Sequence, residues 1–346
     1  MNRWKPLLWR ENKESSVQQI VLAQRPVGEP ASADFGIIDV AARALRDGEV
    51  RVAPTYFSVD PYLRGRMSDA KSYVPPFVVG GPIASGAVGR VIESQSPGLA
   101  VGDRVTGVMD WSEEPVVDAR GLTKLPDDAS VSESWYLGVL GMPGLTAYVG
   151  LTEIGGMSGG EEIFISGAAG AVGSIAGQIA KAQGAKVFGS AGSAEKVAQL
   201  RRLGFDDAFC YREESPRRAL ARMAPSGINL YFDNVGGAHL EAALDSLVDF
   251  GVVISCGAIS LYNATEAVAG PRNFEASVVK KRLRIQGFIV TDHMKSYPRF
   301  VEEVAPLIEG GKLQVLETVR EGFASLPEAF LGLFHGDNLG KMIVRV

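Results

Sequence analysis

The segment 161–173, which reads EEIFISGAAGAVG, constrains the fold more than any other part of this chain. Residues 163–165 are a short apolar run of the kind that favours a β-strand, and Ser166-Gly167 ends it. Apolar residues then recur with the spacing of one helix face, at positions 172, 175, 176, 179 and 180. A strand, a glycine-rich turn and an amphipathic helix in this order predict the first half of a βαβ unit.

The turn inside this segment has the features of a phosphate-binding site. Glycines let an anion approach the backbone, and the N-terminus of the following helix offers unpaired N–H groups and a positive dipole end. The usual dinucleotide pattern is G-x-G-x-x-G, whereas this turn reads AAGAVG, with alanine in the first place. We interpret Gly170, Ala171, Val172 and Gly173 as a pyrophosphate site; the alternative is a turn that only joins a strand to a helix.

Composition places the chain among ordinary globular proteins. Its 346 residues exceed the usual size of one hydrophobic core, so we expect two domains. A net charge of −5 gives no reason to expect nucleic acid or a membrane as a partner. The segment 135–152 is uncharged and long enough to be considered as a membrane-spanning helix. Its four glycines and Pro143 instead favour a buried segment of a soluble protein.

Cysteine usage and the N-terminus bear on the compartment. Cys210 and Cys256 are the only cysteines, which speaks against a disulfide scaffold. Residues 1–10 contain no apolar run of the kind that a secretory signal needs. We therefore expect a cytoplasmic protein.

The chain changes character near residue 130. Before it, short Val- and Ile-bearing runs bounded by Gly, Pro and Asp predict a small barrel or sandwich, and they lie at 19–23, 49–58, 86–93 and 104–109. A helical stretch is expected at 132–140, and from residue 160 strands and helices alternate, which predicts a parallel, doubly wound sheet. The expected strands are 163–166, 185–190, 208–211, 230–233, 251–257 and 284–290, and the expected helices are 171–183, 193–203, 215–223, 238–249 and 297–310.

Two lone strands are expected near the C-terminus, at 314–319 and 342–346. They follow the last expected helix and belong to no further βαβ unit, so the chain is expected to return to its first domain there. The expected division is one domain of 1–130 with 315–346 and a nucleotide-binding domain of 131–314.

The second strand of the nucleotide unit ends without an acidic residue. An Asp or Glu at this point would bind the ribose 2′-hydroxyl, but the chain reads SAGSAEK from Ser190 to Lys196. Lys196 falls in the first turn of the next helix, within reach of a 2′-phosphate, while Glu195 is expected to point away. This favours NADPH over NADH; the alternative is that Lys196 is a solvated surface lysine.

Seven motifs in order extend this interpretation to the whole chain: AAGAVGS, GSAEK, LGFD, YFDNVGG, CGAIS-x-YN, QGFIV and NLGK. With FSVDPYLRGRM at 57–67, the sequence resembles the medium-chain dehydrogenase/reductase superfamily, in its zinc-independent prostaglandin reductase and alkenal/one double-bond reductase branch. The resemblance implies an α/β fold, with a GroES-like β-barrel domain, a Rossmann domain with a doubly wound parallel sheet, and an active site in the cleft between them. It also implies a homodimer.

The same resemblance implies a set of cofactor contacts. Lys196 and Tyr211 match positions that contact the adenosine 2′-phosphate, and Asn234 matches the Asn of the DNVGG motif. The loop beside the nicotinamide ribose corresponds here to Cys256, Gly257, Ala258, Ile259, Ser260 and Tyr262. The segment beside the nicotinamide corresponds to Phe288, Ile289 and Val290, and a C-terminal cofactor contact corresponds to Asn338.

The residues that hold zinc in alcohol dehydrogenases of this superfamily are missing. Ser58-Val59-Asp60 contains no Cys or His, and Gly80-Gly81-Pro82 stands where a Gly-His-Glu would be needed. Two cysteines cannot supply the four thiolates of a structural zinc site. The histidines are scattered and are more typical of surface or packing residues: His239, His293 and His335. No metal is expected.

Hydride transfer without a Lewis acid suits a substrate that is already activated, such as an enone. Negative charge then builds on the carbonyl oxygen and needs a hydrogen-bond donor in an apolar cleft. Tyr262 is our candidate donor, because its phenol stays protonated at neutral pH; a structural loop tyrosine is the alternative. Tyr56 and Tyr62 are expected to line the substrate cleft, with packing as the alternative for Tyr62. We interpret Arg64 and Arg66 as surface charges; the alternatives are pairing with acidic neighbours or contact with a substrate carboxylate.

The predicted activity is NADPH-dependent reduction of the C=C bond of α,β-unsaturated ketones and aldehydes, with hydride delivered to the β-carbon of this small-molecule substrate. One alternative is a zinc-free quinone oxidoreductase. The other is a protein that binds NADPH without turnover. The YFDNVGG and CGAIS-x-YN motifs favour the enone branch.

Overall fold

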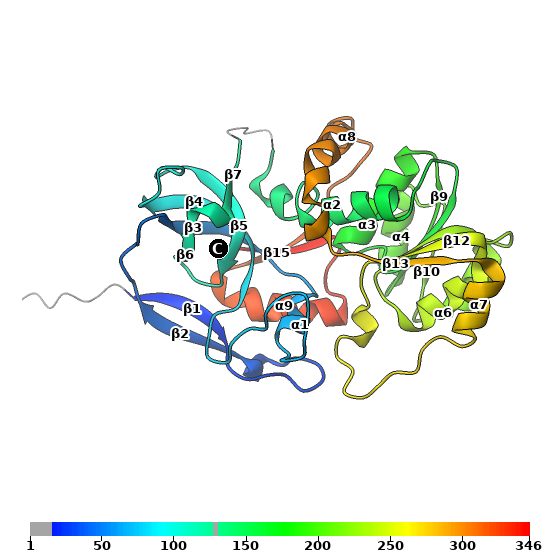
Figure 1. Cartoon of the computed structure of the whole chain (residues 1–346), viewed down its shortest axis with the longest axis horizontal. Coiled ribbons are helices and arrows are strands. Elements are labelled where there is room, and N and C mark those ends of the chain that lie inside the picture. The colour runs from blue at the N-terminus through cyan, green and yellow to red at the C-terminus, as the bar shows by residue number, and fades with distance from the viewer. Residues whose placement is uncertain (1–15, 127–130) are drawn as a thin grey trace, which may run out of the picture.

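Two large β-sheets organise the chain, a seven-stranded sheet on the left of Figure 1 and a six-stranded sheet on the right. The computed structural model describes residues 16–126 and 131–346. Residues 1–10, in which the sequence predicts no secretory signal, lie outside the described part.

The seven-stranded sheet combines strands from the N-terminal part of the chain with two strands near the C-terminus. Its order is β14-β15-β3-β4-β5-β7, with β6 paired to β3. The C-terminal strand β15 runs antiparallel to β3, so that Ile343 lies opposite Ser58. The strands are β3 (Glu49–Ser58), β4 (Ala84–Ser94), β5 (Arg104–Asp110), β6 (Val116–Asp118), β7 (Leu122–Lys124), β14 (Glu317–Glu321) and β15 (Lys341–Arg345).

Smaller elements complete this lobe. The strands β1 (Ser16–Leu22) and β2 (Phe35–Ala41) form an antiparallel pair, and the short helix α1 (Leu63–Arg66) follows β3. Helix α9 (Leu326–His335) buries Leu326 and Phe330 in the same hydrophobic core as Phe57. The C-terminal segment is therefore part of the core of the N-terminal lobe.

The six-stranded sheet is wholly parallel, in the order β10-β9-β8-β11-β12-β13. Side chains of β8 alternate between its faces: Ile163 and Ile165 enter one hydrophobic core, and Phe164 enters another. The strands are β8 (Glu162–Ile165), β9 (Lys186–Ala191), β10 (Asp207–Cys210), β11 (Ile228–Asp233), β12 (Leu247–Ser255) and β13 (Arg284–Gly287).

The helices between these strands cover the sheet (Figure 1). They are α3 (Ala171–Ala182), α4 (Ala194–Arg202), α5 (Pro216–Met223), α6 (Gly237–Ser246) and α7 (Phe274–Lys281), and α8 (Tyr297–Glu309) follows β13. Because β8 lies between β9 and β11, the strand order reverses beside it. In open parallel sheets a ligand binds at such a reversal, outside the carboxyl ends of the strands.

The uncharged segment 135–152 is buried, as predicted. It forms a short 3₁₀ turn, Glu133–Leu137, and then helix α2 (Met142–Val149), whose residues after Met142 are all buried. No helix in the described ranges is long and apolar enough to cross a membrane.

The predicted alternation of strands and helices is confirmed, with shifts at several ends. The helix expected over 132–140 is only the 3₁₀ turn. The helix expected over 238–249 ends at Ser246, because β12 already begins at Leu247 and contains an irregular Phe250 with φ of 62°. The strand expected over 284–290 ends at Gly287. The sequence also predicted no β2, β6, β7, α1, α2, α7 or α9.

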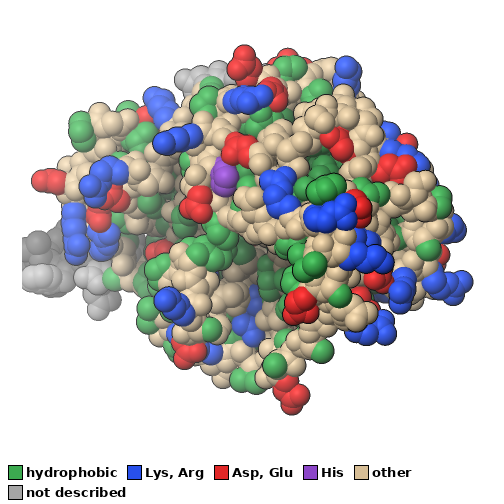
Figure 2. Space-filling model, turned by 45° about the vertical axis from the view of Figure 1, so that its right-hand side comes forward, with side chains coloured by type: hydrophobic (Ala, Val, Ile, Leu, Met, Phe, Trp, Pro, Cys, Tyr) green, Lys and Arg blue, Asp and Glu red, His purple; other side chains and the backbone are tan. Residues whose placement is uncertain are grey.

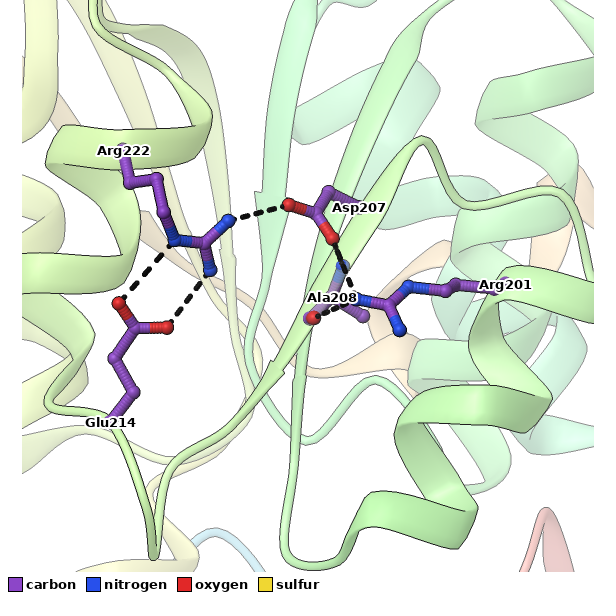
Figure 3. A network of polar contacts seen from close by, with 5 residues as sticks. All are labelled: Arg201, Asp207, Ala208, Glu214 and Arg222. Atoms are coloured by element: carbon purple, nitrogen blue, oxygen red, sulfur yellow. Dashed lines mark hydrogen bonds and ion pairs between the residues drawn. The ribbon is translucent and has the colours of Figure 1, made fainter.

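A group of ion pairs braces the outer edge of the six-stranded sheet (Figure 3). Asp207 of β10 accepts from Arg201 of α4 at 3.0 Å and from Arg222 of α5 at 2.8 Å, and Arg222 also binds Glu214 at 2.9 Å. Each exposed ion pair alone contributes little to the stability of the folded protein. Together they tie α4 and α5 to β10, and Arg222 also holds Glu214 in the loop 211–215, which carries Tyr211.

Candidate active site

A cleft of about 1050 Å³ lies between the two lobes and is lined by residues of both. Figure 2 shows the hollow, with hydrophobic side chains along its walls. It opens over the carboxyl ends of β8, β9 and β11, where the strand order reverses. Its volume is at the upper end of ligand pockets, so it suits a large cofactor beside a smaller substrate.

The glycine turn after β8 forms one side of this cleft. Gly167, with φ of 59°, makes a left-handed turn directly before Ala168, the position that the first glycine of the usual pattern would occupy. A Cβ on Gly173 would lie 2.6 Å from the Gly167 carbonyl oxygen, so α3 packs too closely for any other residue. Gly170 caps α3 without a side-chain hydrogen bond, which leaves the first N–H groups of the helix for an anion. Gly170, Ala171, Val172 and Gly173 all line the cleft and fit a pyrophosphate.

A basic pocket lies at the end of β9. This strand ends without an acid, as predicted, and Lys196 in the first turn of α4 lines the cleft together with Tyr211. The Lys196 ammonium donates to the Gly336 carbonyl oxygen at 2.7 Å. Burial, and then the nearby charge of Arg212, lower the pKa of Lys196. A half-buried ammonium that feels a second cation, Arg212, as well as the acid Asp337 suits a 2′-phosphate.

The remaining predicted cofactor residues line the other half of the cleft, with one exception. Asn234 and Asn338 are oriented by hydrogen bonds to the carbonyl oxygens of Ser166 (2.8 Å) and Gly340 (2.8 Å). Ala258 does not line the cleft; its N–H donates to the Tyr262 hydroxyl. The lining residues of this half include Asn234, Cys256, Gly257, Ile259, Ser260, Tyr262, Phe288, Ile289, Val290 and Asn338.

Two groups on this side hold their protons at neutral pH. Burial raises the pKa of the Cys256 thiol to about 12, so Cys256 is no thiolate nucleophile. Burial also raises the pKa of the Tyr262 phenol. The Tyr262 oxygen accepts a long hydrogen bond of 3.4 Å from the Ala258 N–H, and no acceptor within the described chain takes its proton. That proton can therefore be donated to a ligand.

Arg64 is buried, so its interpretation as a surface charge is wrong. It is 7% exposed and donates to the carbonyl oxygen of Gly28 at 2.9 Å and to the Asn263 side-chain oxygen at 3.1 Å. Asn263 follows Tyr262 directly, whereas Arg64 belongs to the opposite lobe. This hydrogen bond crosses the cleft and fixes the loop that carries Tyr262.

Only one of the two tyrosines expected in the substrate cleft lines it. Tyr62 lies in the wall, whereas Tyr56 packs against a separate cluster that includes Leu125 and Leu137. The Tyr56 hydroxyl accepts from Arg345 at 3.2 Å. Tyr56 lies on β3, where successive side chains face opposite sides of the sheet, and it falls on the side away from the cleft. The expectation for Tyr56 is therefore corrected.

The site of the missing zinc ligands holds a buried ion pair. The Lys341 ammonium donates to Asp60 at 2.9 Å and to the carbonyl oxygens of Val59 (2.8 Å) and Met342 (3.0 Å). Three acceptors use all three of its protons. This pair ties β15 to the end of β3. In residues 16–126 and 131–346, no three His, Cys, Asp or Glu side chains are grouped to hold a metal.

His239 makes the stability of the protein depend on pH. Its ring stacks on Phe164 and Phe209, and burial lowers its pKa from 6.5 to about 4. Between these values the unfolded chain binds a proton that the folded protein excludes, so stability is complete above about pH 6.5 and falls below it.

We expect the free energy of unfolding to drop by about 2 kcal/mol more for the wild type than for His239→Phe between about pH 7 and pH 5. Phenylalanine keeps the ring stacking, so the comparison isolates the proton. Urea unfolding at both pH values measures it. Equal losses in the two proteins would contradict this role.

Comparisons with known proteins agree with this geometry. Residues 18–125 match a family described as the N-terminal domain of oxidoreductase, and residues 171–306 match one described as zinc-binding dehydrogenase. The chain is 44% identical to a protein of Bacillus subtilis named as an NADP-dependent oxidoreductase, covering 96% of this chain and 98% of that one. It is 41% identical to the NADP⁺-dependent 2-alkenal reductase of Nicotiana tabacum, again over 96% and 98%.

A solved structure shares the whole fold. CurA from Vibrio vulnificus in complex with NADPH superimposes with a TM-score of 0.90 at 37% identity, covering 95% of this chain and 99% of that one. The predicted fold class, a GroES-like β-barrel domain with a Rossmann domain, is thereby confirmed. This chain belongs to the medium-chain dehydrogenase/reductase superfamily, in its zinc-independent branch of alkenal and prostaglandin reductases.

Proposed function

We propose that this oxidoreductase uses NADPH to reduce the C=C bond of α,β-unsaturated ketones and aldehydes, with hydride delivered to the β-carbon. The observation that carries the proposal is Tyr262, a neutral phenol with a free proton on the wall of a largely apolar cleft. The cofactor assignment rests on Lys196 and the acid-free end of β9, and on relatives named for NADP or NADPH.

The protein's own residues would stabilise the charge that forms on the substrate. NADPH, when bound, supplies the hydride. The carbonyl oxygen of the enone then gains negative charge, and the Tyr262 hydroxyl donates a hydrogen bond to it while keeping its proton. A proton from solvent adds to the α-carbon and completes the saturated product. Apolar side chains in the wall of the cleft, such as Phe288, would exclude water and so strengthen this hydrogen bond. Arg64 holds the Tyr262 loop in place through Asn263.

Three activities are separated by one set of assays. Purified protein with NADPH is expected to consume a medium-length 2-alkenone, at a rate that a metal chelator leaves unchanged. A quinone oxidoreductase would instead consume NADPH with a quinone and ignore the alkenone. A protein without turnover would show a thermal shift with NADPH and no consumption with either substrate.

The assembly and the compartment remain predictions. A homodimer is consistent with β13, an edge strand of the six-stranded sheet with mostly exposed residues. Light scattering at several concentrations measures the mass; a monomer at all of them would contradict the dimer. Cys210 and Cys256 are both free, as expected for the cytoplasm.

A further inference from the structure

Asp233 ends β11 as a buried carboxylate, 3% exposed, directly before a tight turn of the chain. Its Oδ1 atom accepts hydrogen bonds from two side-chain hydroxyls and two backbone N–H groups. The donors are the hydroxyls of Tyr231 (2.7 Å) and Ser166 (3.2 Å) and the N–H groups of Val235 (2.9 Å) and Gly236 (2.7 Å). Because the acceptor is charged, these bonds belong to the stronger, charge-assisted kind, and they fix the turn to the carboxylate.

The Tyr231 hydroxyl is a fixed donor in this network. Its ring is fully buried and stacks on Phe164, with the ring centres 5.1 Å apart. Burial, and then the charge of Asp233, raise the pKa of the Tyr231 phenol, so the phenol keeps its proton. The ring contacts set the direction of the hydroxyl, and the hydroxyl in turn holds the Asp233 carboxylate.

The turn that Asp233 holds supports the loop that carries Tyr262. Donors of this loop bind the backbone carbonyl oxygens of residues 233–235 at distances between 2.5 and 3.2 Å. These donors are the N–H groups of Cys256, Gly257, Ile259 and Ser260 and the Ser260 hydroxyl. The place of the Tyr262 phenol therefore depends on the shape of the turn.

The same network reaches the glycine turn at the start of α3. The Ser166 carbonyl oxygen accepts from the Asn234 side chain at 2.8 Å, and the Ser166 hydroxyl accepts from the Asn234 N–H at 3.0 Å. A Cβ on Gly167 would lie 3.5 Å from the Asn234 Cβ, so the two turns are in contact. One buried carboxylate thus joins the candidate pyrophosphate site to the loop of Tyr262.

We propose that Asp233 is a positioning residue, which sets the place of the Tyr262 hydroxyl through the turn 233–236, while Tyr231 holds its carboxylate. This inference rests on the proposed function, because that function makes Tyr262 the hydrogen-bond donor. A donor that moves by a fraction of its bond length loses much of its effect on the rate. The simpler alternative is that Asp233 only closes the end of β11.

The test is a double-mutant cycle of Tyr231→Phe and Tyr262→Phe, measured as kcat for a 2-alkenone at saturating NADPH. Tyr231→Phe keeps the stacked ring and removes one donor from Asp233, so kcat should fall roughly 10-fold in the wild-type background. In the Tyr262→Phe background no donor is left to misplace, and the same change should alter kcat by less than about twofold. An equal loss in both backgrounds would overturn the inference.

Tyr297→Phe is the matched control. Its half-buried hydroxyl donates to the Leu140 carbonyl oxygen at 2.9 Å, and Tyr297 does not line the cleft. This variant also loses one hydroxyl and one hydrogen bond, so its melting temperature reports the general cost of such a change. Its kcat should match that of the wild type.

Amide hydrogen exchange tests the same link without catalysis. In the full-length protein, Tyr231→Phe should speed exchange in the loop 256–262 about 10-fold while exchange in α9 stays unchanged. Unchanged exchange in the loop would contradict the inference. If the wild type reduces no enone, the proposed function fails, and exchange still decides whether Asp233 holds the loop.

Asp233→Asn replaces Tyr231→Phe in both measurements should the latter not fold. The amide oxygen can take the place of Oδ1, so the substitution removes the charge and keeps an acceptor. The same loss of kcat and the same faster exchange are expected. A wild-type rate together with wild-type exchange would leave Asp233 as a structural residue at the end of β11.

Discussion

Replacing Tyr262 by Phe is expected to lower kcat for a 2-alkenone by about 100-fold, with little change in NADPH affinity. The substitution removes one hydroxyl and keeps the ring. Because the Tyr262 hydroxyl accepts only the long bond from Ala258, the folded loop loses little. The enolate oxygen, however, loses its preorganised donor, and removal of such a donor typically costs two to three orders of magnitude. Steady-state kinetics and NADPH fluorescence titration measure the two effects.

Tyr56→Phe provides a matched control for this experiment. Tyr56 belongs to a packing cluster on the other side of β3, and its hydroxyl meets only Arg345 within the described chain. Its kcat is expected to match that of the wild type. If Tyr262→Phe also keeps the wild-type rate, then Tyr262 is a structural loop tyrosine and the donor must be another group.

Lys196→Ala is expected to raise the KM for NADPH roughly 10- to 100-fold while that for NADH stays within about twofold. The half-buried ammonium lies where the strand end lacks an acid, beside Tyr211 and a second cation, Arg212. Only NADPH carries the phosphate that this charge would bind. Initial rates with both cofactors measure the ratio.

Lys181→Ala is the corresponding lysine control. Lys181 lies in the last turn of α3 and pairs with Asp206 at 2.9 Å, so its loss should leave both KM values unchanged. An equal rise for NADPH and NADH in Lys196→Ala would mean that Lys196 acts on a part that both cofactors share.

Sequence reasoning found the elements whose hydrophobic period is long and regular. The β8–turn–α3 unit is an example, because one helix face and one strand specify it locally. Elements whose burial depends on distant partners were missed. Helix α9 is buried against a core that includes Phe57, far away in the chain, and α7 is only Phe274–Lys281 and has no fully buried residue. The strand that was expected to reach Val290 ends earlier for a similar reason. Its partner β12 ends at Ser255, which pairs with Gly287, so the later residues have no neighbouring strand there.

The site divides in the same way. Residues in ordered motifs, such as Gly170, Lys196 and Tyr262, were assigned from the sequence and do line one cleft. Arg64 and Arg66 are only two residues apart in the sequence. The sequence around them does not predict that Arg64 is buried and bonded to Asn263 while Arg66 lines the cleft. That difference arises only when the two lobes meet. The direction of Tyr56 likewise depended on which face of β3 the cleft occupies.

The central claim is that hydride adds to the β-carbon of an enone. It is tested most directly by reducing a medium-length 2-alkenone with NADPH deuterated at the transferring position and locating the label by NMR. We predict a saturated ketone with deuterium on its β-carbon. An allylic alcohol with deuterium on the former carbonyl carbon would contradict the account.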